Sequence, residues 1–391
     1  MIHVAIIGCG SISRLHIEGY LAFPERCVIT ALCDMAPEKG EDQKKKYGLE
    51  GAKVFASHVE LLKTLKDGET CIDMVSICTP PFTHTEITVD CLKVGVNTLV
   101  EKPMAASLEE CDAMLSAAKE SGKMLACIAQ NRFREPITAL KKILDAGLIG
   151  RVLHAQVDSF WWRGFHYYDL WWRGKWKTEG GGCTLNHTVH HIDMLIWMMG
   201  LPEKVTAVLS NAVHTNAEVE DVSVAVLRYP QGTLVQITSS VLHHGEEQQL
   251  IFQGEKARVS APWKVHASLA GSNAFPLPEH DTELEKRLHD FVAALPPMQH
   301  TGHTGEIEDV LYALENGRPP AIGGQDGRNT IELISAIYKA GATETTVSLP
   351  LCKDDPFYTV KGILAQVPHF YEKAASVQSF EGDITTGGSY K

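Results

Sequence analysis

Short apolar runs alternate with helical repeats through residues 1–125. The apolar runs predict strands at His3–Ile7, Val28–Cys33, Met74–Thr79 and Asn97–Val100. The segments between and after them repeat apolar residues with helical spacing and predict helices at Ser11–Tyr20, Pro37–Tyr47, Phe82–Val94 and Leu108–Glu120. Strands that are buried on both faces are continuously apolar, so this pattern predicts a parallel sheet with helices on both sides.

The pattern changes after about residue 150. Strand-like segments separated mostly by short turns occur at Arg151–Trp161, Lys204–Val213, Val222–Tyr229, Thr233–Leu242, Gln248–Gln253 and Ala257–Trp263. Helical repeats return at Glu283–Ala294, Glu306–Glu315 and Asn329–Lys339. We therefore expect an α/β chain whose second domain contains an open, mostly antiparallel sheet. The expected divisions are 1–125, 126–358 and a tail at 359–391, with the last 20 residues weakly ordered.

Composition narrows the class of protein. The 391 residues are 44% hydrophobic and 21% charged, as in ordinary globular proteins, and the net charge of -12 argues against nucleic acid or an anionic membrane as a partner. No apolar run reaches the roughly 18–20 residues of a membrane span. The chain begins directly with a predicted strand, and its ten cysteines contain no CxxC pair. We therefore expect no signal peptide, reduced thiols and a cytoplasmic location.

The first candidate site is the glycine turn Gly8-Cys9-Gly10, which follows the first predicted strand. Gly8 permits a tight turn, and Gly10 lets backbone amides approach a pyrophosphate at the N-terminus of the next helix. Ser13 replaces the third glycine of the usual fingerprint. Asp34 ends the second predicted strand, where a carboxylate can accept hydrogen bonds from ribose hydroxyls and repel a 2′-phosphate. This combination predicts NAD; the alternative is an ordinary turn beside a solvated aspartate.

A second candidate site follows the strand at 97–100. Lys102, within Glu101-Lys102-Pro103, can donate a hydrogen bond to a substrate hydroxyl. It can also stabilise the alkoxide that forms as hydride leaves. The alternative is a surface lysine before a turn. His84 lies just after Thr79-Pro80-Pro81, where either a site role or local packing and capping is compatible with the sequence.

The third candidate site is the segment from Gly180 to Asp193, in which three glycines precede an amphipathic helical pattern. The i,i+4 spacing of Asn186 and His190 predicts that both lie on one helical face. A histidine with an ordinary pKa of about 6.5 can accept a hydroxyl proton. A structural role for His190 is the alternative. The spacing of His187, His190 and Asp193 is not a standard zinc pattern, so no metal is expected.

Five of the seven tryptophans lie within residues 161–176, interleaved with tyrosine, arginine and lysine. Aromatic faces stack on the apolar faces of sugar rings, and nearby polar groups bind hydroxyls. Core packing or a subunit interface would also concentrate aromatic residues. The segment therefore predicts either a sugar pocket or buried packing, or a division between the two.

Together these motifs resemble the Gfo/Idh/MocA oxidoreductases over nearly the whole chain, to about Tyr358. The resemblance is carried by Gly8-Cys9-Gly10, Val75-Ser76-Ile77-Cys78-Thr79-Pro80-Pro81 with His84, Glu101-Lys102-Pro103, Asn131-Arg132-Phe133, the triple-glycine segment through His190-His191-Ile192-Asp193, Gly323-Gly324-Gln325-Asp326-Gly327-Arg328 and Ala336-Ile337-Tyr338. It implies an N-terminal NAD-binding Rossmann domain and a C-terminal α/β domain for substrate binding and oligomerisation. The cofactor would lie in the cleft between them, and the chain would form a homo-oligomer, a dimer or a tetramer.

The resemblance also assigns residues. Lys102 and His190 are the implied catalytic pair, and Asn186 stands where many members have aspartate. An amide cannot act as a carboxylate base, so proton transfer would depend on His190 while Asn186 orients a hydroxyl. The expected cofactor contacts are Gly8, Gly10, Ser11, Ile12, Asp34, Thr79, Pro80, His84, Glu101, Lys102 and Gln130. The expected substrate contacts are Arg163, Trp172, Arg173, Trp176, Asn186 and His187.

The segment Trp172-Arg173-Gly174-Lys175-Trp176 is similar to a subgroup that acts on pyranosides, often at C3. The predicted function is NAD-dependent hydride transfer at a secondary hydroxyl of a sugar or glycoside. One alternative is glycoside cleavage through a transient 3-keto sugar with recycled NAD. Another is a non-catalytic NAD-binding sensor, against which the presence of Lys102 and His190 argues.

Overall fold

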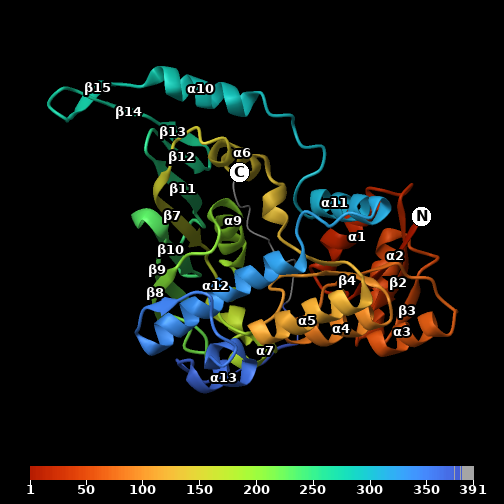
Figure 1. The fold of residues 1–391 in the computed structure, drawn as a ribbon. Coiled ribbons are helices and arrows are strands. Elements are labelled where there is room, and N and C mark those ends of the chain that lie inside the picture. Colours follow the sequence, from red (N-terminus) through yellow and green to blue (C-terminus); the bar gives the residue numbers. More distant parts are fainter. Residues whose placement is uncertain (374, 379, 381–391) are drawn as a thin grey trace.

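The first sheet of the computed structural model is parallel throughout, as predicted. The structure describes residues 1–373, 375–378 and 380. The six strands lie in the order β3-β2-β1-β4-β5-β6 with helices on both sides (Figure 1). The elements are β1 Ile2–Ile7, α1 Ser13–Leu21, β2 Cys27–Cys33, α2 Pro37–Tyr47, β3 Lys53–Phe55, α3 His58–Lys66, β4 Met74–Ile77, α4 His84–Lys93, β5 Asn97–Val100, α5 Leu108–Ser121 and β6 Leu125–Cys127. This strand order brings the carboxyl ends of β1, β2, β4 and β5 to one edge.

The second sheet has eight strands in the order β13-β12-β11-β7-β10-β9-β8-β16. Its elements are β7 Val152–Phe160, β8 Lys204–Ser210, β9 Val222–Arg228, β10 Leu234–Ser240, β11 Gln248–Gly254, β12 Arg258–Ala261, β13 Lys264–His266 and β16 Val347–Ser348. The sheet is mostly antiparallel, as expected, but β7 and β10 pair in parallel. Helices α9 (Val189–Met199) and α12 (Gly324–Thr343) pack against it.

The sequence analysis expected the first unit to end at residue 125, but segments beyond that residue also contribute to it. Strand β6 completes its sheet, and helix α11 (Gly302–Asn316) returns from far along the chain to pack on α1. Ile307, Val310 and Leu311 of α11 belong to the same buried core as residues of β1. The C-terminal half of the chain therefore contributes to the first unit, and the two units share a boundary built from distant segments.

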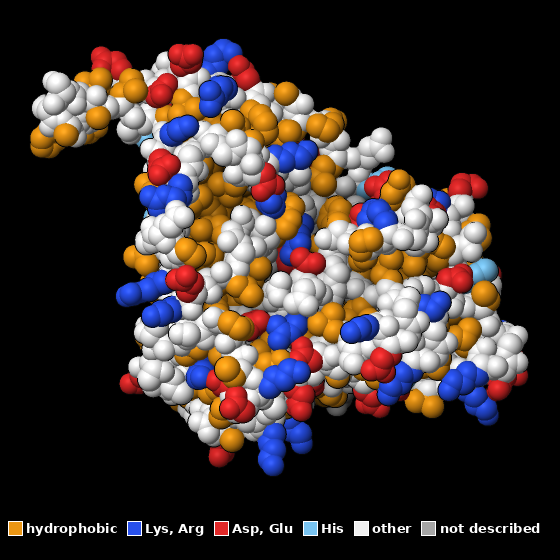
Figure 2. Space-filling view, in the orientation of Figure 1, with side chains coloured by type: hydrophobic (Ala, Val, Ile, Leu, Met, Phe, Trp, Pro, Cys, Tyr) orange, Lys and Arg blue, Asp and Glu red, His pale blue; other side chains and the backbone are white. Residues whose placement is uncertain are grey.

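Helices α6 (Glu135–Asp145) and α10 (Thr282–Ala293) flank the far end of the second sheet, next to a hairpin of β14 (Ser268–Ala270) and β15 (Pro276–His280). The hairpin extends away from the body, and hydrophobic side chains lie along it (Figures 1 and 2). Phe275 at its turn is 70% exposed. Among the described residues, no helix is long and apolar enough to cross a membrane.

Most of the last 20 residues, which were expected to be weakly ordered, lie outside the described part of the chain. After helix α13 (Val360–Gln366), the chain lies against residues 168–173. Val377 exchanges backbone hydrogen bonds with that segment, donating to Asp169 at 2.8 Å and accepting from Trp171 at 2.8 Å. The Lys373 ammonium donates to the carbonyls of residues 168, 170 and 173. We call residues 367–373 and 375–378 the C-terminal strap; residues 374, 379 and 381–391 lie outside the described part of the chain.

Candidate active site

The glycine turn between β1 and α1 has the shape that a dinucleotide requires. Gly8 has φ +93°, and a Cβ there would lie 2.7 Å from the backbone of Cys78, so only glycine fits. A Cβ on Gly10 would meet nothing within 4 Å, which leaves its outer side open to a phosphate. Ser11 is exposed and Ile12 is half-buried as the chain enters α1. The turn therefore fits a pyrophosphate at the N-terminus of α1.

Asp34 lies at the carboxyl end of β2, beside this turn. Its carboxylate accepts hydrogen bonds from the backbone N–H of Cys9 at 2.8 Å and of Ala36 at 2.9 Å. These bonds fix the carboxylate next to Gly10 while it remains partly exposed. A fixed negative charge at this place fits the ribose of NAD and disfavours a 2′-phosphate.

Residues after β4 form a second part of this edge. Thr79 and Pro80 are half-buried, but His84 is fully buried in the first turn of α4. Its Nδ1 lies 2.9 Å from the Pro103 carbonyl and its Nε2 lies 2.8 Å from the Thr79 carbonyl. The predicted cofactor contact of His84 is therefore corrected: both ring nitrogens bond to the protein, and the ring joins the Thr79 loop to the turn after β5.

Glu101, at the end of β5, is buried and held from two sides. Its Oε1 lies 3.0 Å from His16 Nε2 on α1 and 3.2 Å from His303 Nε2 on α11, while Oε2 accepts the backbone N–H of Lys102 at 3.0 Å. Burial alone would raise the pKa of this carboxyl, but the hydrogen bonds from the two histidines hold that pKa well below its usual range. Glu101 is thus a fixed anion that positions Lys102 through its backbone N–H. The prediction that Glu101 contacts the cofactor directly is corrected accordingly.

Lys102 and His190 line one hollow between the two units, together with Met104, Ile128 and Val189. Lys102 Nζ donates to the backbone carbonyl of Asn186 at 3.3 Å. Burial, and then the charge of Lys102, lower the pKa of His190 well below its usual range. Burial likewise lowers the pKa of Lys102. Both lowered pKa values favour the neutral forms of the two side chains.

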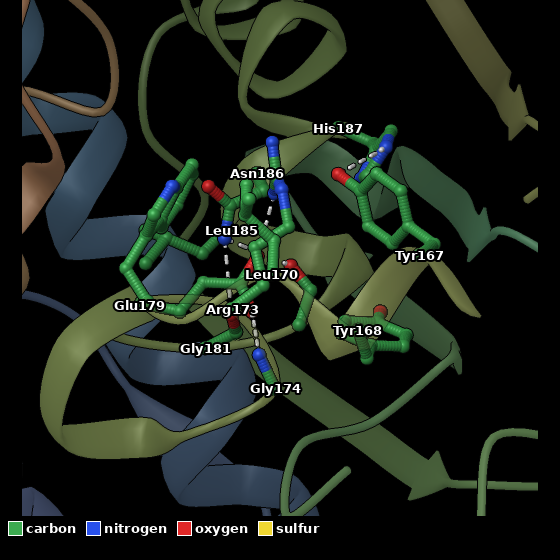
Figure 3. A network of polar contacts seen from close by, with 12 residues as sticks. Tyr167, Tyr168, Leu170, Arg173, Gly174, Glu179, Gly181, Leu185, Asn186 and His187 are labelled. Carbon is green, nitrogen blue, oxygen red and sulfur yellow. Dashed lines mark hydrogen bonds and ion pairs between the residues drawn. The ribbon is translucent and has the colours of Figure 1, made fainter. Parts of the chain in front are cut away.

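The expectation that Asn186 and His190 share one helix is wrong. Asn186 ends the short helix α8 (Cys183–Asn186), and α9 begins at Val189. His187 between them has φ -110° and ψ -50°, which breaks the helical path. The Asn186 amide nitrogen donates to the Gly181 carbonyl at 3.0 Å, as Figure 3 shows, and this bond fixes the amide in an orientation from which its oxygen can accept a hydrogen bond. Asn186 and His190 reach the same region from two helices.

Asp193 is not available as a metal ligand. Its carboxylate accepts hydrogen bonds from two nitrogens of the Arg132 guanidinium, Nε at 2.8 Å and Nη2 at 2.7 Å. Asp326 at the start of α12 accepts from the same guanidinium at 3.0 Å. Arg132 thereby joins the η2 turn (Gln130–Phe133), α9 and α12 behind the site. In that turn the amide oxygen of Gln130 is buried without a partner among the described residues.

An aromatic and cationic wall faces His187. Tyr167 OH lies 3.4 Å from His187 Nε2 (Figure 3). The guanidinium of Arg173 lies 4.4 Å from the centre of the Tyr167 ring, and that of Arg163 lies 5.7 Å from it. Trp161 packs obliquely on the His187 ring. The predicted substrate contacts Arg163, Arg173 and His187 are thus brought together around Tyr167.

The two tryptophans of the predicted set divide. Trp172 is half-buried and stacks with Arg173 at 4.1 Å, at the edge of this wall. Trp176 is 2% exposed; its N–H donates to the Pro368 carbonyl and its ring packs on Tyr338. The predicted substrate contact of Trp176 is therefore corrected to core packing beneath the wall.

The sequence did not identify four residues that position these groups. His16 and His303 hold Glu101, Glu179 holds Arg173 at 2.8 Å, and Lys373 ties the C-terminal strap to the wall. His16, His303 and Lys373 each lie far in sequence from the residues that they hold, whereas Glu179 lies close to Arg173. For Glu179 the signal was its place next to the triple glycine, three residues after Trp176.

A dinucleotide turn and Lys102 at the carboxyl edge of the first sheet, with His190 of α9 lining the same hollow as Lys102, fit a nicotinamide-dependent dehydrogenase. Residues 2–128 match the oxidoreductase family with an NAD-binding Rossmann fold, and residues 137–260 match the GFO/IDH/MocA C-terminal domain. The chain belongs to the Gfo/Idh/MocA family of oxidoreductases, and its cofactor is NAD.

Relatives place the chain more closely. The myo-inositol 2-dehydrogenase of Thermotoga maritima is 25% identical over 353 residues, covering 88% of this chain and 98% of its own. The D-glucoside 3-dehydrogenase of Escherichia coli is 23% identical, covering 89% of this chain and 97% of its own. The crystal structure of the WlbA dehydrogenase from Bordetella pertussis, in complex with NADH and UDP-GlcNAcA, has a TM-score of 0.74 and 27% identity, covering 90% of this chain and 99% of that one.

Proposed function

We propose that this protein oxidises a secondary hydroxyl of a sugar or glycoside, at C3 of a pyranose, with NAD as hydride acceptor. The observation that carries the proposal is the approach of Lys102 to the Asn186 carbonyl in the hollow that His190 also lines. The relatives named for inositol and glucoside dehydrogenases support a polyhydroxylated ring as substrate. Position C3 is supported by the name of the glucoside 3-dehydrogenase alone.

The residues divide the work by their chemistry. NAD, when bound, supplies the hydride acceptor. His190 takes the hydroxyl proton, since its lowered pKa keeps it unprotonated near neutral pH. Lys102 donates a hydrogen bond to the same oxygen and stabilises the charge that develops there. The amide oxygen of Asn186 accepts a neighbouring hydroxyl and fixes which carbon faces the cofactor.

The test follows the hydrogen that is removed. A methyl glucoside deuterated at C3 is incubated with the enzyme and NAD, and the NADH formed is analysed by mass spectrometry. We expect deuterated NADH and a 3-keto product. Unlabelled NADH would place the oxidation at another carbon.

Cleavage with recycled NAD is a second candidate, since the relative named 2,7-anhydro-N-acetylneuraminate hydratase of Escherichia coli, 25% identical over 263 residues, carries the name of a reaction without net redox change. Release of the aglycone without net NADH would establish this second candidate. Binding of NAD without turnover of any sugar would instead indicate a sensor.

We also propose that the chain forms a homo-oligomer through the open face of the second sheet. Side chains of β8, β9 and β10 alternate between buried and exposed, and the exposed face carries Val208, Val224, Val226 and Leu234. Helices α9 and α12 cover the other face (Figure 1). An apolar face of this kind is typical of a surface that a second subunit covers.

A further inference from the structure

We infer that the sugar carries an anionic group, a carboxylate or a phosphate, held by Arg163 and Arg173 beside His187. This inference rests on the proposed sugar dehydrogenase activity and specifies its substrate class. The two guanidinium groups lie on the Tyr167 ring, at 5.7 and 4.4 Å from its centre. A planar guanidinium binds carboxylate and phosphate oxygens through paired hydrogen bonds, so two of them around one ring form an anion subsite.

The hydrogen bonds of Arg173 leave part of its fork for a ligand. Its Nη1 donates to Glu179 at 2.8 Å, and Glu179 is anchored in turn by the backbone N–H of Gly174 at 2.6 Å (Figure 3). Among the described residues, Nε and Nη2 of Arg173 have no hydrogen-bond partner. The side chain is 19% exposed. Glu179 thus fixes the guanidinium and leaves two nitrogens on which an anion can bind.

His187 supplies an independent sign of a missing ligand. The residue is 7% exposed, and its Nδ1 is buried without a partner among the described residues. A buried polar atom without a hydrogen bond is costly, and such atoms in native structures usually await water or a ligand. The ring lies against Tyr167 and Trp161, so a ligand that reached it would also meet the aromatic wall.

The charges that act on His187 are those of Arg163, Arg173 and Lys102. Glu179 and Glu246 are each paired with one arginine, and Glu101 is held by His16, His303 and the backbone N–H of Lys102. Burial lowers the pKa of His187 well below its usual range, and the charges of Arg163, Arg173 and Lys102 lower it further. An anion at this place would offset that field, whereas a neutral sugar would leave it uncompensated.

The test compares three substrates that share one ring: a neutral methyl hexopyranoside, its C6 carboxylate and its 6-phosphate. For each, kcat/KM is measured with NAD for the native enzyme, Arg163→Gln and the control Arg151→Gln, whose exposed arginine pairs with Glu255 away from the wall. We expect one anionic substrate to exceed the neutral one by about ten-fold or more, and Arg163→Gln to remove most of that advantage. Arg163→Gln should lower kcat/KM for the anionic substrate by a larger factor than for the neutral one, and Arg151→Gln should lower neither. The preferred anion distinguishes carboxylate from phosphate.

A neutral sugar that reacts as well as both anions would overturn the inference while leaving the dehydrogenase proposal intact. Equal losses for anionic and neutral substrates in Arg163→Gln would also overturn it. If no sugar reduces NAD, the proposed activity fails separately, and calorimetry of the NAD-loaded enzyme with the uronate and the phosphate decides the anion subsite. Binding that Arg163→Gln weakens would support the subsite, and absence of binding by either anion would exclude it.

Discussion

Hydrogen bonds hold both the backbone and the side chain of Lys102. Its backbone N–H donates to Glu101 at 3.0 Å, and its ammonium donates to the Asn186 carbonyl at 3.3 Å. Glu101 is itself held by histidines from α1 and α11. Lys102 is therefore positioned by three elements that meet only in the folded chain, so the tripeptide motif indicated the lysine but not the residues that support it.

The first prediction concerns the catalytic pair. Replacing either Lys102 or His190 by alanine should lower kcat/KM by about 10²–10⁴-fold, the range for loss of a general acid–base group. Because burial and Lys102 lower the pKa of His190, the base is unprotonated above that lowered value, and the acid limb of the native kcat/KM profile should lie below pH 6.5. Calorimetry should show unchanged NAD binding by His190→Ala. Near-native turnover of His190→Ala, or an acid limb at or above 6.5 in the native enzyme, would contradict this role.

The second prediction concerns Asp34 and cofactor choice. The native protein should bind NAD more tightly than NADP, because a 2′-phosphate would meet this carboxylate. Asp34→Ala should lower the ratio of the NADP dissociation constant to the NAD dissociation constant by roughly ten-fold or more. Asp34→Asn is the matched variant, since it removes the charge and keeps an oxygen acceptor for the N–H of Cys9. Affinities of both cofactors are measured by calorimetry; tighter binding of NADP by the native protein would refute the assignment.

At the scale of elements, the C-terminal strap is the least expected feature. The Lys373 ammonium of the strap donates to the backbone carbonyls of residues 168, 170 and 173, in the segment that carries Tyr167 and Arg173. The third prediction is that Lys373→Met raises KM for the sugar by about three- to thirty-fold, since lost charged hydrogen bonds let the wall shift, while NAD affinity is unchanged. Lys361→Met, on the exposed side of α13, is the control. Equal KM values in Lys373→Met and the control would show that the strap does not organise the wall.

Periodicity predicted elements whose ends also carry local signals. Helix α2 has the predicted bounds, with Pro37 in its first turn and Gly48 in the left-handed conformation after its end. Strand β3 has only three residues, too few for a period, and the hairpin of β14 and β15 is fully exposed, so neither was predicted. The break at His187 was missed because backbone dihedrals there depend on packing rather than on apolar spacing.

The candidate site was predictable to the extent that single motifs carry chemistry. Lys102 and the glycine turn were found because each follows a strand at the edge of a parallel sheet, and His190 was found because it follows the triple glycine at the start of a helix. The roles of His84 and Trp176 were wrong because only tertiary contacts show that their polar atoms bond to Thr79, Pro103 and Pro368. Sequence identifies candidate groups, whereas burial and partners decide which of them face a ligand.

At the scale of the whole molecule, the fourth prediction concerns the open face of the second sheet. Replacing both Val224 and Val226, each 42% exposed, by lysine should convert an oligomer to monomers, because charged side chains cannot be covered without loss of hydration. Val59→Lys, on α3 of the first unit, is the control with a similarly exposed valine. Light scattering after gel filtration gives the mass. An unchanged mass in the double variant, or a native monomer, would contradict the proposed interface.

The account as a whole depends on net hydride transfer from a sugar to NAD in the cleft between the two units. The most direct measurement follows NADH absorbance and product structure together while the native enzyme is offered a panel of neutral and anionic pyranosides with NAD. The account predicts NADH and keto sugar in equal amounts for at least one substrate, with oxidation at C3. Product formation without net NADH, or no reaction with any sugar despite NAD binding, would contradict it.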